Sequence, residues 1–74
     1  MITEKEMMEH EGNAEVILRI FELVNNREDL DIEPCIFIAD LLHDVHWWCD
    51  IRGYEWQSAV DLERVFYDDA MRPT

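Results

Sequence analysis

Positively charged residues are scarce in this sequence. Its 74 residues include only six Lys and Arg against eighteen Asp and Glu, which gives a formal net charge of −12. Proteins that bind DNA, RNA or anionic membranes without sequence preference use Lys and Arg to neutralise phosphate groups. We therefore expect no direct contact with nucleic acid or with a membrane surface. An acidic surface instead steers association towards Lys- and Arg-rich surfaces of other proteins, or serves solubility alone.

Glycine, proline and cysteine are also rare, with two of each. Gly12 and Gly53 stand far apart in the chain, so no glycine-rich phosphate loop exists. Cys35 and Cys49 would lie roughly 21 Å apart on one helix, which is too far for a disulfide. No apolar run reaches the roughly eighteen residues of a membrane span, and no signal segment opens the sequence. We expect a reduced, cytoplasmic protein.

Apolar residues are plentiful, in spite of the charge. They make up 49% of the chain, and aromatic residues make up 11%. This content argues against disorder and predicts a packed domain. A chain of 74 residues is long enough for one domain and too short for two, so we expect residues 1–74 to form a single domain.

The apolar residues recur at helical spacing in three segments, over residues 4–24, 34–52 and 55–71. We predict an all-α fold, a small three-helix bundle. The first segment contains Gly12–Asn13, which is either a weak point inside one helix or a break that leaves a loose N-terminal turn.

Residues at the ends of these segments match known helix-end signals. Thr3 and Glu6 form a capping box before the first helix. Pro34 suits the first turn of the second helix, and Gly53 suits a left-handed residue just after its end. In the polar connection between the first two helices, Leu30 and Ile32 are the residues expected to be buried.

The second predicted helix has two apolar sides. At about 100° per residue, one broad arc collects the residues expected to form the core. These are Phe37, Ile38, Leu41, Leu42, Val45, Trp48 and Cys49. The opposite arc carries Ile36, Trp47 and Ile51 among polar residues, and an apolar line on that side predicts a second contact. The amino-terminal segment, a symmetric partner or a foreign protein would each supply one.

We predict that a protein partner binds this second side of the helix. The predicted partner-binding residues are Trp47, Ile36, Ile51, Asp40, His43, Asp44 and Asp50. Aromatic anchors carry much of the energy at interfaces, and surrounding charges set orientation and rate. A homodimer through the same side would bring His43 near its symmetry mate, and protonation there would weaken the dimer at mildly acid pH.

The stretch "HDVHWWCD" at residues 43–50 raises a metal site as the alternative. His43, His46 and Cys49 recur every three residues and spread over about 120° of the helix. Structural zinc takes four ligands, usually Cys or His, and only "EHE" at residues 9–11 offers further donors. The alternative function is a metal-binding regulatory or catalytic domain that uses His43 and His46.

Catalysis and cofactor binding are not the preferred interpretation. Cys49 is expected to be buried among acidic residues, which oppose thiolate formation. Paired carboxylates and histidines in the pattern of di-iron bundles are also absent from the sequence. We expect a protein that is not an enzyme and that needs no cofactor.

The stretch "IADLLHDVHWWCDIRGYEWQSAVDLERVFYDDA" resembles a loose class of short acidic proteins from bacteriophages and mobile elements. In that class a helix of the type A-D-L-L-x-D-x-x-x-x-C-D ends in a glycine, and the next helix begins aromatic-x-x-A. The matching residues are Ala39, Asp40, Leu41, Leu42, Asp44, Cys49, Asp50, Gly53, Trp56 and Ala59. The resemblance covers less than half of the chain.

That resemblance implies a setting in which small acidic proteins block host defence machinery, some of them as nucleic-acid mimics. An inhibitor of CRISPR or restriction systems, acting in the host cytoplasm, is its sharpest form. Asp40, Asp44 and Asp50 would then present carboxylates where nucleic acid binds, with Trp47 as the anchor.

Overall fold

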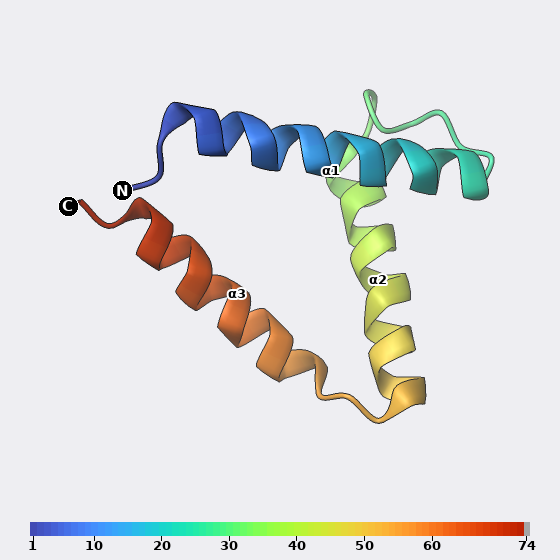
Figure 1. Ribbon diagram of the computed structural model, residues 1–74. Coiled ribbons are helices and arrows are strands. Elements are labelled where there is room, and N and C mark those ends of the chain that lie inside the picture. The colour runs from blue at the N-terminus through green and yellow to red at the C-terminus, as the bar shows by residue number, and fades with distance from the viewer. Residues whose placement is uncertain (74) are drawn as a thin grey trace.

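The computed structural model describes residues 1–73 and contains three helices (Figure 1). They are α1 (Glu4–Val24), α2 (Pro34–Arg52) and α3 (Trp56–Met71), and no strand occurs in this part of the chain. The predicted all-α, three-helix fold is confirmed. Helix α1 runs through Gly12 and Asn13 without a break, and α3 begins one residue after the predicted position.

The start of α1 shows the hydrogen bonds of the expected cap. The Thr3 hydroxyl accepts a hydrogen bond from the Glu6 backbone N–H at 3.1 Å and donates one to the Glu6 carboxylate at 3.0 Å. The backbone N–H groups of a first helical turn have no partner within the helix, so such a side chain stabilises the end.

Two asparagines end α1. The Asn25 side chain donates to the Phe21 carbonyl at 2.9 Å, and Asn26 takes a left-handed conformation with φ of 52°. Asparagine tolerates that region better than most residues because its short side chain bonds locally. The chain therefore leaves the helix axis here and enters the connection that leads to α2.

Gly53 ends α2 as its sequence position predicted. Its φ is 77°, its N–H donates to the Asp50 carbonyl at 3.2 Å, and the Tyr54 N–H donates to the Cys49 carbonyl at 2.8 Å. A left-handed residue at this position satisfies the last free carbonyls and reverses the chain. Only three residues separate α2 from α3, which fixes a sharp corner.

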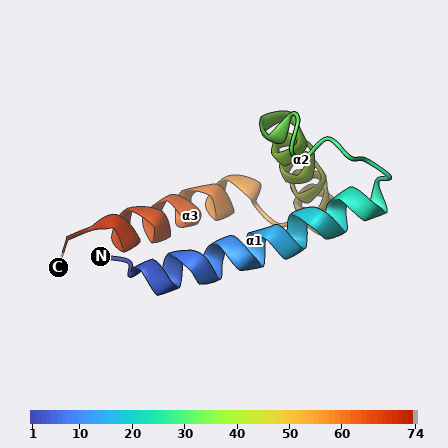
Figure 2. The ribbon, with the colours of Figure 1, turned by 90° about the horizontal axis from the view of Figure 1, so that it is seen from above.

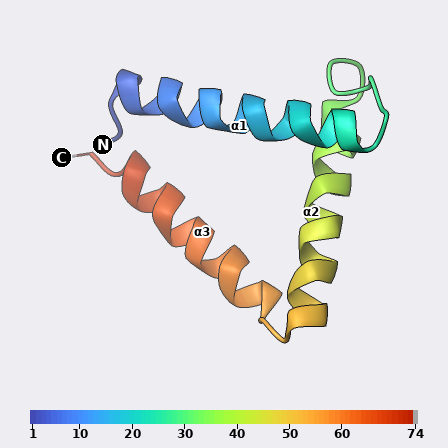
Figure 3. The same ribbon diagram turned by 45° about the vertical axis from the view of Figure 1, so that its right-hand side comes forward.

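The three helices form the sides of a triangle (Figures 1 and 3). The chain ends meet at one corner, where the Ile2 N–H donates to the Ala70 carbonyl at 2.6 Å. The molecule measures 42 × 31 × 16 Å, and the view from above shows α1 and α3 as two separate ribbons with α2 seen nearly end-on (Figure 2). Its shortest dimension, 16 Å, is less than two helix diameters of about 10–12 Å each.

The best-packed region is the corner between α1 and α2. Phe37 is fully buried there, and the centroid of its ring lies 5.3 Å from that of Phe21 in a T-shaped pair. The Arg27 guanidinium lies 5.0 Å from the centroid of the same ring. Leu30, from the segment that connects α1 and α2, is also buried, so the prediction for Leu30 is confirmed. This corner is where α1 and α2 are joined.

Ion pairs of Arg27 close the corner on its polar side. Arg27 donates to Asp29 at 2.6 and 3.1 Å and also binds Asp40 of α2. The hydrogen bonds from Arg27 lower the pKa of Asp29. One arginine thus connects the end of α1, the loop and the first half of α2.

The predicted core of α2 is wrong in most positions. Only Phe37 and Cys49 are buried, and Leu41 is half-buried. The residues that remain exposed are Ile38, Leu42, Val45 and Trp48. The reason is the triangle: α3 leaves the lower corner diagonally towards the chain start instead of lying along α2 (Figures 1 and 3). The prediction for Ile32 is also wrong, because that side chain points to solvent.

Leu30 and Ile32 provide a matched pair of substitutions in one loop. Leu30 is 6% exposed and Ile32 is 78% exposed. We expect Leu30→Ala to lower the free energy of unfolding by about 2–5 kcal/mol, since it leaves a cavity, and Ile32→Ala to change it by about 0.5 kcal/mol or less. Urea unfolding followed by circular dichroism measures both. Equal effects of the two substitutions would contradict the described corner.

The pair between Arg27 and Asp29 predicts a pH dependence. Because the pKa of Asp29 is lowered from 3.8 in the folded chain, its contribution to stability is complete above that ordinary value and is lost as the pH falls through the lowered one. We expect Asp29→Asn to lower the urea midpoint at pH 7, and the difference from the wild type to vanish in strong acid. Glu28→Gln is the control, because Glu28 is exposed and forms no ion pair within residues 1–73.

Candidate functional site

The predicted partner-binding line lies on the exposed side of α2. Ile36 is 56% exposed, Trp47 is 55% exposed and Ile51 is 78% exposed. These three residues follow one another along the helix, since their positions differ by eleven and four. Neither the amino-terminal segment nor α3 covers them. We call this line, with His43, Asp44 and Asp50 beside it, the Trp47 face.

A hydrogen bond holds the ring of Trp47. Its Nε1–H donates to Nε2 of His43 one turn earlier at 3.2 Å, and the two rings stand nearly perpendicular, at 83°. A neutral histidine that accepts at Nε2 carries its proton on Nδ1, so this geometry assigns the tautomer. Protonation of His43 would place a second N–H where the indole N–H now points and would break the bond.

His46 has a different neighbour. Its ring stacks on Trp56 at the start of α3, with 4.7 Å between centroids and 14° between planes. The stack fixes the corner between α2 and α3 and leaves a shallow depression of about 220 Å³ lined by His43, His46, Trp47 and Asp50. Trp48, on another side of α2, pairs with Tyr54 and lies under the Arg52 guanidinium.

The three acidic residues predicted for this face differ in their surroundings. Asp40 pairs with Arg27, so much of its charge is neutralised within the chain. Asp44 and Asp50 are exposed and form no ion pair within residues 1–73. The sequence did not indicate the Arg27–Asp40 pair, because the two residues meet only through the fold of the α1–α2 connection.

The few basic residues are mostly engaged by acidic neighbours. Arg19 binds Glu15, Glu22 and Asp31, and these hydrogen bonds, with Asp31 first, raise its pKa. Arg64 and Arg72 pair with Asp68 and Asp69 of α3. Seven of the eighteen carboxylates are thus in ion pairs, and the other eleven have no basic partner within residues 1–73. The surface is strongly acidic overall.

The residues of the alternative metal site do not converge. Within residues 1–73, no three side chains of His, Cys, Asp or Glu lie close enough together to share one metal ion. His43 uses Nε2 for the indole of Trp47, and His46 is stacked on Trp56. Cys49 is buried, and Cys35 is exposed at the start of α2. No observed arrangement therefore favours the metal-binding alternative.

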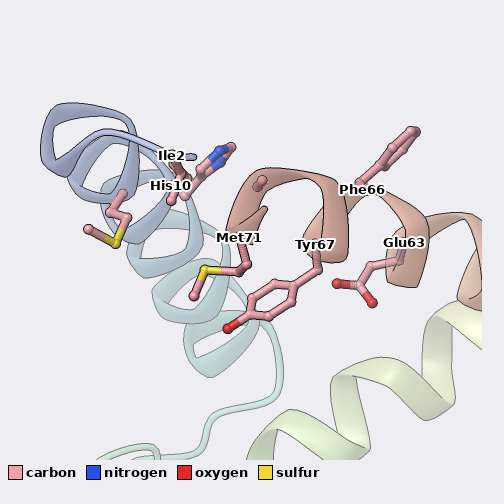
Figure 4. Close-up of a pocket in the computed structure, with 8 residues that line it drawn as sticks. Ile2, His10, Glu63, Phe66, Tyr67 and Met71 are labelled. Atoms are coloured by element: carbon pink, nitrogen blue, oxygen red, sulfur yellow. The ribbon is translucent and has the colours of Figure 1, made fainter. Parts of the chain in front are cut away.

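A second depression, of about 460 Å³, lies between the start of α1 and the end of α3. Its lining is mostly apolar and comprises Ile2, Met7, His10, Glu63, Phe66, Tyr67, Ala70 and Met71. In Figure 4, Glu63, Tyr67 and Met71 extend to one side of α3 and Phe66 extends to the other. None of its lining residues is among those predicted to bind a partner; the one sequence feature that marks the depression is the acidic Glu63 among apolar residues of α3.

Comparison with protein-family models, with curated proteins and with solved structures finds no match for this chain. Across residues 1–73, no helix combines the length and apolar composition that a bilayer crossing needs.

The hydrogen bond between Trp47 and His43 predicts a restrained indole ring. In a Trp48→Phe, Trp56→Phe background, Trp47 is the only tryptophan. We expect His43→Leu to lower its fluorescence anisotropy at constant pH, because leucine cannot accept the hydrogen bond from Nε1–H. His46→Leu should leave the anisotropy unchanged, since His43 and not His46 accepts that bond. Equal anisotropy in the His43 variant and its parent would contradict the bond.

Proposed function

We propose that this chain is a non-enzymatic protein-interaction module that binds a basic surface of another protein through the Trp47 face. The observation that carries the proposal is an exposed tryptophan, held by His43, between two exposed isoleucines on one helix. Large apolar residues that line up on the exposed side of a helix are typical of interaction sites.

The composition of the face supports a protein partner. Tryptophan is among the residues most enriched at interaction hot spots, where it fills a pocket of the partner. Ile36 and Ile51 extend the apolar contact along about four turns of α2. An α-helix that offers apolar residues in a row can dock in a groove of a partner protein.

The charge around the face supports a basic partner. Asp44 and Asp50 are free to pair with Lys or Arg of another protein, and the chain as a whole carries a charge of −12. Such a field raises the rate of encounter with a positively charged surface and makes that rate depend on salt.

A narrower form of the proposal rests on the resemblance to acidic phage proteins. In that form the chain occupies the nucleic-acid groove of a host defence protein, of the CRISPR or restriction type, in the host cytoplasm. Its carboxylates would take the positions of phosphates. The absence of excess Lys and Arg fits a protein that competes with nucleic acid and does not bind it.

Trp47→Ala tests the general proposal. We expect circular dichroism to show unchanged helicity, and affinity for the partner to fall about thirtyfold, which corresponds to about 2 kcal/mol for a tryptophan anchor. Partners are captured from bacterial lysate and their affinity is then measured by calorimetry with the purified protein. Tyr54→Ala is the control, because Tyr54 is an equally exposed aromatic residue outside the face. Equal losses in both variants would contradict the assignment of the face.

The narrower form has its own test. The purified chain is added to a CRISPR effector or a restriction enzyme, and binding of target DNA is measured. We expect inhibition that weakens as salt increases, and weaker inhibition by the Asp44→Asn, Asp50→Asn variant. Unchanged DNA binding by these enzymes would reject the proposal of a defence inhibitor. The general proposal of an interaction module would still be tested by the capture experiment with Trp47→Ala.

A further inference from the structure

A single chain has a larger solvent-accessible surface area than a folded monomer of its mass. Its solvent-accessible area is 6485 Å², whereas a folded monomer of 8.9 kDa exposes about 4,800 Å². Its radius of gyration is 14.4 Å, whereas a compact domain of this length has about 11 Å. The chain therefore exposes roughly 1,700 Å² more than the surface of a typical monomer.

The excess surface area arises because the three helices are arranged in one layer. Stable domains enclose their core between at least two layers of secondary structure. Here the triangle is a single layer, only three apolar side chains among residues 1–73 are buried, and just one of them, Phe37, is fully enclosed. A second layer is required to cover the remaining apolar side chains.

One side of α2 is suited to that second layer. Ile38, Leu42 and Val45 follow one another at helical spacing on the same side as the buried Cys49. Each of the three is between 41% and 49% exposed. We call this line the Leu42 stripe. It lies about 140–180° around the helix from Trp47, so the two surfaces are on opposite sides of α2.

The Leu42 stripe is also free of acidic residues. All the carboxylates of α2, on Asp40, Asp44 and Asp50, lie on the half of the helix that carries Trp47. The half of α2 opposite Trp47, which carries Ile38, Leu42 and Val45, contains no Asp or Glu, in a chain that has eighteen of them. Two copies of this acidic chain can therefore pack along this side of α2 without bringing carboxylates of the two α2 helices together. A basic partner would find no carboxylate of α2 to pair with on this side.

We infer that the second layer is a second copy of this chain, packed through the Leu42 stripe in a symmetric dimer. If each copy covers the excess of the other, the interface removes roughly 3,400 Å² from solvent, which lies in the range of about 2,000–5,000 Å² for obligate homodimers. A twofold interface uses one self-complementary patch, and an uncharged apolar stripe meets that requirement.

The dimer leaves the proposed binding site accessible. Because Trp47 is on the opposite side of α2, each dimer presents two Trp47 faces.

Dimerisation and binding of a basic partner respond to salt in opposite directions. Screening weakens attraction to a basic partner but relieves the repulsion between two chains of charge −12, so salt strengthens the dimer. The inference stands without the proposed function, since it rests on area and packing.

Sedimentation equilibrium of the full chain tests the inference. We expect twice the mass of 8.9 kDa, tighter association at higher salt, and a urea midpoint that rises with protein concentration, because folding and association are then coupled. A monomer at 100-micromolar concentrations, with a midpoint independent of concentration, would overturn the dimer.

Leu42→Asp and Trp47→Asp form the matched pair that locates the interface. Each adds one carboxylate to α2, at side chains that are 49% and 55% exposed, so a lone chain tolerates both equally. The dimer predicts that Leu42→Asp abolishes association, leaving a monomer or an unfolded chain, while Trp47→Asp keeps the dimer mass. Equal behaviour of the two variants, or loss of the dimer only with Trp47→Asp, would overturn the assignment of the stripe. Binding of a foreign partner to the Trp47 face is measured in the separate capture experiment, so the dimer and the proposed function can fail independently.

Discussion

The contact between Phe37 and Arg27 determines how α1 and α2 meet. The aromatic ring is enclosed by Phe21 on one side and by the guanidinium on another, and the same guanidinium pairs with Asp29 and Asp40. In a chain with few basic residues, one arginine thus fixes a loop, the end of one helix and the start of another. The remaining corners rely on shorter connections and on stacked rings, such as His46 on Trp56.

The position of that corner decides which surfaces remain open. Phe37 and Cys49 are buried near opposite ends of α2, and the helix between them is exposed on both sides. One side is polar, acidic and carries Trp47; the other is apolar and free of carboxylates. The separation of charge around a single helix gives its two sides different chemical character.

Local features of this fold could be predicted from the sequence, and long-range ones could not. Thr3, Pro34 and Gly53 mark helix ends through hydrogen bonds and backbone conformations that involve only near neighbours. The burial of Phe37 and the exposure of Trp47 follow from helical spacing. Leu42 and Ile38 were expected in the core, because spacing reveals an apolar side but not whether another helix of the same chain covers it. The Arg27–Asp40 pair likewise depends on the path of a loop.

The hydrogen bond between Trp47 and His43 bears on the entropy of the proposed interaction. A free tryptophan side chain on a helix samples several rotamers, and fixing it on association opposes the affinity gained from its contacts. Here the indole is already oriented by a neighbour one turn away, so that loss is partly incurred during folding. In the proposed interaction the ring would meet the partner in one fixed orientation, and loss of the His43 acceptor would return the indole to its several rotamers.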